Sequence, residues 1–262
     1  MVVISVINRK GGVAKTTSAV NLAAIYGKEG YKVLVIDVDS QMNATSYLNM
    51  YRIKENTSYE LLCDVNTPIT DTIRKTEICN IDICPGGLNL DKAYEKLLFM
   101  GSREYILKKK LWAIKDKYDF VFIDCPAARD IITTNALTAS DYAILPCEPN
   151  ELGVDSLVLM YEFAEEVKSS FNLDLRIAGI FFVKKGSRSV IHREYSRILR
   201  EDFDRFNYFN SSVRSASAVE KSHYAHKPLI LNAPNEPVTQ DYIAVSKELL
   251  EIIKNGGNHN GI

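Results

Sequence analysis

The sequence predicts an α/β fold in which a doubly wound, mostly parallel sheet carries helices on both faces. Short apolar runs typical of buried strands alternate with helical patterns along the chain. A glycine-containing loop joins the first of these runs to a helix, and carboxylates follow two later runs. Because ligands of open α/β sheets bind beyond the carboxyl ends of the strands, these loops also mark the expected site.

The expected elements follow one another without a linker or an internal repeat. A chain of 262 residues with 46% hydrophobic residues suits one domain with a large core. We expect this domain to span residues 1–254 and a flexible polar tail to occupy 255–262. The first strand begins at residue 2, so we expect no leader segment and no DNA-binding domain before it. Strands are expected at 2–7, 32–36, 119–123, 142–145 and 176–182, and helices from residue 16 and at 238–254.

The loop after the first strand has the composition of a phosphate-binding loop. It reads Lys10-Gly11-Gly12-Val13-Ala14-Lys15-Thr16-Thr17. In such a loop, backbone N–H groups and the positive end of the next helix face the phosphates, a lysine reaches the terminal phosphates and a hydroxyl binds Mg²⁺. Lys15 and Thr16 suit these two tasks, and Gly11 and Gly12 suit the tight turn. Ala14 stands where glycine is usual, so we expect its φ to be negative.

Carboxylates follow two of the other expected strands. Asp37 and Asp39 come after the run 32–36, and Asp124 comes after the run 119–123. The carboxyl ends of parallel strands lie at one edge of a sheet, so these side chains are expected beside the phosphate-binding loop. There, a carboxylate can orient water or Mg²⁺ opposite the loop hydroxyl.

These motifs resemble those of the deviant Walker-A ATPases, the group of ParA, MinD and the nitrogenase iron protein. Their signature is K-G-G-x-x-K-[ST]-[ST], and Lys10 supplies its first lysine. The segment 37–45 resembles the D-x-D-P-Q-G-N-A-T segment of ParA proteins, and 135–141 resembles their N-A-L-x-A-x-D segment. The similarity covers nearly the whole chain and is weak over 50–118 and 184–210.

The resemblance implies an ATP hydrolase with weak intrinsic activity that uses ATP and Mg²⁺. In that family the first lysine reaches the nucleotide of the partner subunit, which implies a homodimer closed by ATP and assigns this contact to Lys10. Adenine is expected near Pro234 and the end of the strand 176–182. The implied catalytic residues are Lys10, Lys15 and Asp39, and the implied Mg²⁺ residues are Thr16, Asp37 and Asp124. Asp39 would orient the attacking water, and Asp37 would hold the water shell of the metal.

Binding to nucleic acid would depend on local patches, because the net charge is −1. Residues 184–227 include ten basic and five acidic side chains. Arg193, Arg197 and Arg200 follow the spacing of one helix face. The resemblance implies non-specific DNA binding by the ATP-bound dimer and adds Arg214 as the first candidate contact. It further implies plasmid or chromosome partitioning with a centromere-binding, ParB-like partner, in the cytoplasm and on the nucleoid.

Two alternatives remain from other classes of protein on this fold. A MinD-like ATPase would act on a membrane or cell-surface assembly, but the C-terminus lacks a basic amphipathic helix, so we expect no membrane binding. An enzyme or metal carrier would need cluster ligands, but the five cysteines form no C-x-x-C pair. The four histidines are expected to be surface residues.

Overall fold

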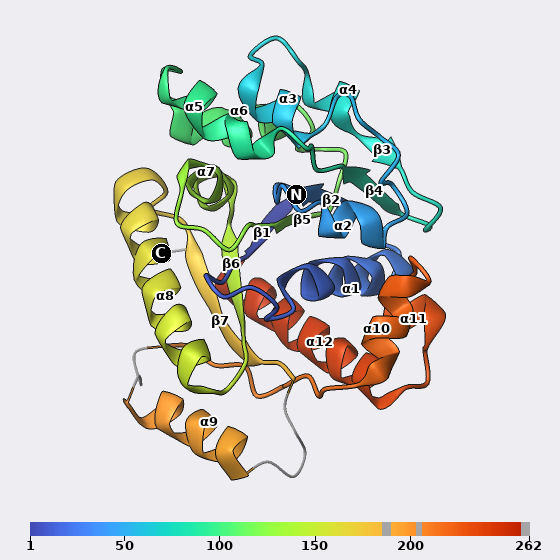
Figure 1. Ribbon diagram of the computed structural model, residues 1–262, viewed down its shortest axis with the longest axis vertical. Coiled ribbons are helices and arrows are strands. Elements are labelled where there is room, and N and C mark those ends of the chain that lie inside the picture. Colours follow the sequence, from blue (N-terminus) through green and yellow to red (C-terminus); the bar gives the residue numbers. More distant parts are fainter. Residues whose placement is uncertain (185–189, 203–205, 258–262) are drawn as a thin grey trace.

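A seven-stranded sheet forms the centre of the structure, a computed structural model that describes residues 1–184, 190–202 and 206–257 (Figure 1). The strands are β1 (Val2–Val6), β2 (Val33–Asp37), β3 (Arg74–Lys75), β4 (Ile81–Cys84), β5 (Phe120–Asp124), β6 (Tyr142–Cys147) and β7 (Arg176–Phe182). Their order is β3-β4-β2-β5-β1-β6-β7, and β3 alone among them runs antiparallel to its neighbour. The predicted fold class is confirmed.

Helices cover both faces of this sheet (Figure 1). The longer ones are α1 (Lys15–Lys28), α7 (Ile131–Ala139), α8 (Glu151–Phe171), α9 (Val190–Asp202), α10 (Ser217–Tyr224) and α12 (Pro237–Gly257). The shorter ones are α2 (Asn43–Tyr47), α3 (Ser58–Cys63), α4 (Ile69–Thr72), α5 (Ala93–Leu98), α6 (Ile106–Trp112) and α11 (Leu229–Asn232). Two single turns of 3₁₀ helix, Leu90–Lys92 and Arg103–Tyr105, precede α5 and α6.

Alternate residues of the strands divide the apolar core into two layers. In β2, Leu34 and Ile36 pack with α3 and α5 to α8, whereas Val33 and Val35 pack with α1, α2, α11 and α12. This alternation is the period of two expected of a strand that is buried on both faces. The glycine-containing loop leaves β1, which lies between β5 and β6, so the loop is placed at the middle of the sheet.

The C-terminal boundary differs from the prediction. Helix α12 continues to Gly257, so the flexible tail predicted from residue 255 is wrong for residues 255–257, and 258–262 lie outside the described residues. The last turn is held by the sheet, because the Arg176 guanidinium donates to the Gly256 carbonyl and the Tyr142 hydroxyl donates to the Ile253 carbonyl at 3.4 Å. The contact with Gly256 satisfies one of the carbonyls that the end of a helix leaves free.

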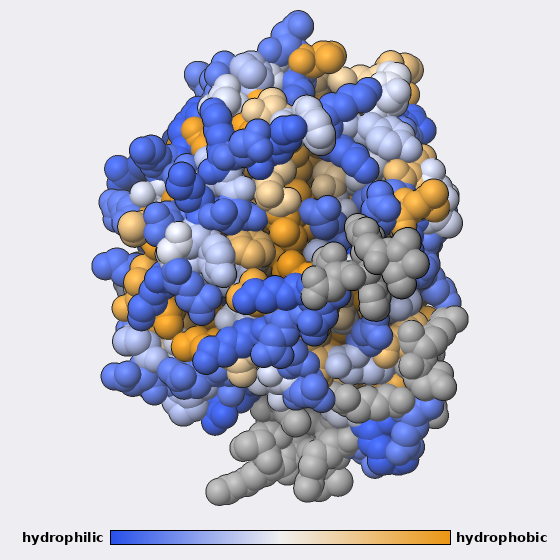
Figure 2. All heavy atoms as spheres, turned by 180° about the vertical axis from the view of Figure 1, so that it is seen from behind, coloured by the Kyte–Doolittle hydropathy of each residue, from blue (hydrophilic) through white to orange (hydrophobic). Residues whose placement is uncertain are grey.

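Within the described part of the chain, no helix combines the length and the apolar composition needed to cross a bilayer. Figure 2 shows the face opposite to that of Figure 1, where hydrophilic side chains surround a narrow central strip of apolar ones. Among the described residues of that face, apolar side chains form this strip and smaller separate patches.

Candidate nucleotide-binding site

The loop between β1 and α1 forms a turn that ends in two left-handed residues. Gly12 has φ +74°, and Ala14, directly before α1, has φ 60° and ψ 29°. The prediction of a negative φ for Ala14 is wrong, because the chain needs a left-handed residue to enter the helix at Lys15. For a residue with a Cβ this conformation costs roughly 1 kcal/mol.

The first turn of α1 is free to bind an anion. No side chain caps it, and it contains no acidic residue. The first N–H groups of a helix have no partner within the helix and carry its positive dipole end. A phosphate bound at this loop would therefore accept hydrogen bonds from the backbone without displacing a protein group.

Lys15 is buried at the base of the loop. Its Nζ donates to the Lys10 carbonyl at 3.3 Å, and the residue is 8% exposed. Burial lowers the pKa of Lys15, whereas the carboxylates of Asp124 and Asp39 act in the opposite direction. A buried ammonium group facing two carboxylates provides the local charge that a nucleotide phosphate and a divalent cation would share.

Asp37 and Asp124 are the last residues of the neighbouring strands β2 and β5 and lie opposite each other in the register. Asp37 accepts hydrogen bonds from the Thr45 backbone N–H at 2.8 Å, the Thr45 hydroxyl at 2.7 Å and the Asp39 N–H at 3.1 Å. Burial raises the pKa of Asp37 to about 6, against the effect of these bonds. Asp37 thus anchors the start of α2, and its place in the Mg²⁺ water shell stays a prediction.

Asp124 is a buried carboxylate whose oxygens lack hydrogen-bond partners among the described residues. Neither of its oxygens has a hydrogen-bond partner of normal geometry within the described residues, although the Thr16 hydroxyl is close enough to favour the charged form. Burial, reinforced by Asp37, raises the pKa of Asp124 well above its usual range. Such a group is costly unless a cation compensates it. A carboxylate and a hydroxyl beside a phosphate-binding loop fit Mg²⁺, a hard cation that prefers oxygen ligands.

A cavity of about 520 Å³ extends from this loop to α10 and α12. Its loop end is lined by Gly11, Gly12, Ala14, Lys15, Thr16 and Thr17, with Asp39 and Gln41 at the side. Its far end is lined by Val183, Lys184, Val213, Arg214, Ala216, Val219, His223 and Tyr242. The volume is in the range of small-ligand sites, and the end of β7 contributes through Val183, close to where the base is expected. Pro234 and the fully buried Val13 do not line it.

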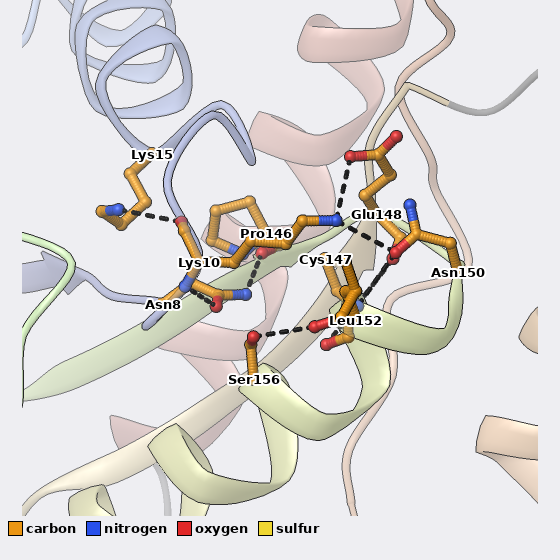
Figure 3. Close-up of polar contacts among 10 residues, drawn as sticks. Asn8, Lys10, Lys15, Pro146, Cys147, Glu148, Asn150, Leu152 and Ser156 are labelled. Atoms are coloured by element: carbon orange, nitrogen blue, oxygen red, sulfur yellow. Dashed lines mark hydrogen bonds and ion pairs between the residues drawn. The ribbon is translucent and has the colours of Figure 1, made fainter.

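Lys10 points away from this cavity. Figure 3 shows that its side chain extends in the direction opposite to Lys15, towards the loop after β6. Its Nζ donates to Asn150 Oδ1 at 3.0 Å and lies 3.5 Å from Glu148 Oε2, with both charged side chains 22% exposed. The backbone below is fixed by Asn8, which accepts from the Lys10 N–H and donates to the Pro146 carbonyl.

His223 was not expected in the site. Its Nε2 lies 3.0 Å from the Thr17 hydroxyl, and the residue lines the cavity. The expectation that every histidine is a surface residue is therefore wrong for His223. His226 is also half-buried, and its Nδ1 lies 2.6 Å from the Ser46 carbonyl. No local pattern marks these contacts, because the partners are 206 and 180 residues apart in the chain.

Two of the four candidate DNA contacts, Arg214 and Arg197, form ion pairs within the chain. Arg214 makes two bonds to the Asp241 carboxylate, at 2.7 and 2.9 Å, and lies at the rim of the cavity. The helix predicted from the arginine spacing is α9, and its Arg197 pairs with Glu194 and Glu201. The side chains of Arg193 and Arg200 lie outside the described residues.

The described residues contain no group of three metal-ligating side chains, and all five cysteines are free. Cys63, Cys84, Cys125 and Cys147 are buried. Burial raises the pKa of Cys84 to about 12. Such thiols are poor nucleophiles and poor ligands at neutral pH.

The loop, the parallel sheet and the buried carboxylate define a P-loop nucleoside-triphosphatase fold. Residues 1–177 match the family model of an AAA domain. The sporulation initiation inhibitor protein Soj of Bacillus subtilis is 32% identical over 94% of this chain and 97% of its own. The chromosome-partitioning ATPase Soj of Treponema pallidum is 37% identical over 72% of this chain and 73% of its own. The chain therefore belongs to the Soj/ParA group of P-loop ATPases.

Solved structures give the same fold. A plasmid partition protein from Borrelia burgdorferi bound to AMPPNP has a TM-score of 0.76 at 27% identity and covers 97% of this chain and 98% of its own. Cobyrinic acid a,c-diamide synthase from Mycobacterium smegmatis with bound ADP and magnesium has a TM-score of 0.81 at 25% identity over 98% and 96%. The second similarity shows that one fold serves different reactions, so the function must be argued from the site.

Proposed function

We propose that this protein is a DNA-partitioning ATPase. ATP closes a homodimer, the dimer binds DNA without sequence preference, and a ParB-like centromere-binding partner stimulates hydrolysis and release. The observation that carries the proposal is the direction of Lys10. Its ammonium group points away from the cavity of its own chain, whereas Lys15 lies at the base of that cavity.

Two lysines in one loop thus have different tasks. Lys15 is in place for the nucleotide of its own chain. Lys10 is half-buried on the side facing the loop after β6. The proposal places the second copy of the chain on this side. In the proposed dimer, Lys10 exchanges Glu148 and Asn150 for the phosphates of the partner's nucleotide. This exchange makes dimer formation depend on ATP.

In this proposal, different residues of the cavity bind the phosphates, bind Mg²⁺ and orient the attacking water. The N–H groups of α1 and Lys15 hold the phosphates, while Thr16 and Asp124 hold Mg²⁺, which neutralises phosphate charge when bound. Asp39 lines the cavity beside the loop and orients the attacking water. Catalysis by positioning and charge needs a closed site, so the isolated monomer is slow. The nucleotide complexes of the two solved relatives support ATP and Mg²⁺ as ligands.

DNA binding is proposed for Arg214 and for the arginines of α9. Arg214 is 51% exposed despite its bond to Asp241, so a phosphate can compete for the guanidinium. A dimer doubles the number of such contacts, which makes binding dependent on both ATP and salt. The names of the Soj relative from Treponema and of the Borrelia protein support partitioning as the process.

The experiment is retention of a random-sequence DNA duplex with no nucleotide, ADP or ATP, at low and moderate salt. We expect retention with ATP alone, and its loss in Lys10→Ala. Lys28→Ala, at the exposed far end of α1, is the matched control and should retain DNA as the unmodified protein does. ATP binding without DNA retention in any state would contradict the proposal, and ATP-dependent retention on liposomes would then assign a MinD-like positioning role.

A further inference from the structure

Helix α10 brings an imidazole ring to the first turn of α1, which follows the phosphate-binding loop. His223 lies near the C-terminal end of this helix, half-buried, and its Nε2 is 3.0 Å from Thr17 Oγ1. Thr17 belongs to the first turn of α1 and is 7% exposed, and both residues line the cavity. The ring therefore contacts a hydroxyl that faces the place where phosphate is expected.

The other side of the ring is fixed by α2. The rings of His223 and Tyr47 are stacked, with centroids 3.8 Å apart and an interplanar angle of 23°. Tyr47 is 1% exposed, and its hydroxyl bonds to Ser222 Oγ at 2.7 Å and to Asn21 Nδ2 at 3.2 Å. Asn21 in turn donates to the Thr17 carbonyl at 2.7 Å. The packing against Tyr47 thus orients the edge of the His223 ring towards Thr17.

The hydrogen-bonding capacity of a hydroxyl determines which of the two groups must donate in the His223–Thr17 contact when a phosphate is bound. A phosphate oxygen only accepts hydrogen bonds, so Thr17 must use its single proton to bind one. If an imidazole N–H donates to the Thr17 oxygen, that proton stays available for the phosphate. A ring that instead accepted from Thr17 would remove it.

We propose that His223 is a positioning residue for nucleotide binding, which donates from Nε2 to Thr17 Oγ1 and so directs the Thr17 hydroxyl proton to a phosphate oxygen. This inference rests on the proposed function, because it needs a nucleotide in the cavity. It deepens that function by adding α10, which lies more than 200 residues from the loop in the sequence, to the phosphate-binding machinery.

Two variants separate the hydrogen bond from the stacking. His223→Phe keeps a flat ring against Tyr47 and removes the N–H, whereas His223→Gln keeps an N–H at a similar reach and removes the ring. Thr17→Val removes the hydroxyl at similar volume. The measurement is the dissociation constant of ADP with Mg²⁺ by isothermal titration calorimetry for the full chain, the three variants and Thr17→Val/His223→Phe.

We expect His223→Phe to bind ADP about tenfold more weakly, and His223→Gln to stay within about threefold of the unmodified protein. The double variant should bind no more weakly than Thr17→Val, since both changes remove one interaction. Additive losses, equal losses in the Phe and Gln variants, or unchanged affinity in His223→Phe would overturn the inference. Lys15→Ala separates the two levels: nucleotide binding that needs Lys15 but not His223 leaves the proposed function intact, whereas no binding, or binding that does not need Lys15, contradicts it.

Discussion

Lys10 Nζ lies 3.5 Å from Glu148 Oε2, and both belong to one chain, so the lysine expected to serve a second subunit is held by its own. The contact joins the phosphate-binding loop to the segment between β6 and α8. A pair of this exposure contributes about 1 kcal/mol or less. It is therefore weak enough to open when a better anion, such as a phosphate, is presented.

Freeing Lys10 should make dimer formation easier. We expect Glu148→Gln to lower the ATP concentration for half-maximal dimerisation about two- to fivefold, measured by sedimentation velocity. Glu166→Gln is the control for the loss of one carboxylate charge. Glu166, in α8, forms an ion pair of the same length with Arg129, 3.5 Å, that does not involve Lys10. A shift of the same size in both variants would show that charge alone, and not release of Lys10, causes the effect.

The left-handed conformation of Ala14 predicts a stabilising substitution. Ala14→Gly should raise the free energy of unfolding by up to about 1 kcal/mol, because glycine adopts φ 60° without a steric cost. Ala244→Gly, at an exposed position inside α12, should lower it by about 1 kcal/mol. Urea unfolding measures both values. A destabilised Ala14→Gly protein would mean that the methyl group contributes packing at the loop.

The buried carboxylate of Asp124 predicts a conflict between stability and function. Its pKa is raised in the folded state, so its contribution to stability is present at low pH and is lost as pH rises through that raised value. Without Mg²⁺, Asp124→Asn should therefore be more stable than the unmodified protein by about 1–3 kcal/mol at pH 8, with the gap narrowing towards pH 5. The same variant should lose Mg²⁺-dependent ATP hydrolysis.

Thermal unfolding at the two pH values tests this prediction, with the exposed Asp116→Asn as control. Asp37 acts in the same direction, because burial raises its pKa to about 6. An Asp124→Asn protein that is less stable at pH 8 would show that the carboxylate is compensated within the protein.

Arg214 predicts the salt dependence of DNA binding. Arg214→Ala should weaken retention by the ATP-bound protein and reduce the slope of log affinity against log salt by about two, one contact for each subunit of the dimer. Arg197→Ala should have a smaller effect, because Glu194 and Glu201 already neutralise this arginine. Filter binding between about 50 and 200 mM salt measures both slopes, because a protein with about six to ten phosphate contacts loses roughly 10³- to 10⁵-fold in affinity over this range. An unchanged slope in Arg214→Ala would remove it from the interface.

Local sequence predicted the features that depend on local geometry. Five of the seven described strands (β1, β2, β5, β6 and β7), the glycine-containing loop, the helix after it and the placement of Asp124 follow from apolar runs and from the order of the βα units. The short strands β3 and β4 were not predicted. Ala14 was mispredicted because the loop conformation, and not the residue's preference, determines its φ. The contacts of His223 and of Lys10 could not be predicted, because they join positions 206 and 140 residues apart. Long-range pairs of this kind leave no periodic pattern in the chain.

Complementation between two inactive variants, Lys10→Ala and Asp39→Ala, tests whether Lys10 serves the nucleotide of the partner subunit. Both keep Lys15 and so bind ATP, but each lacks one group needed for hydrolysis. In a mixed dimer, the site on the Lys10→Ala chain keeps its own Asp39 and receives Lys10 from the partner. An equimolar mixture should therefore recover up to about a quarter of the unmodified rate of phosphate release in the presence of DNA. If Lys10 served its own nucleotide, no site in the mixture would be complete and no activity would return.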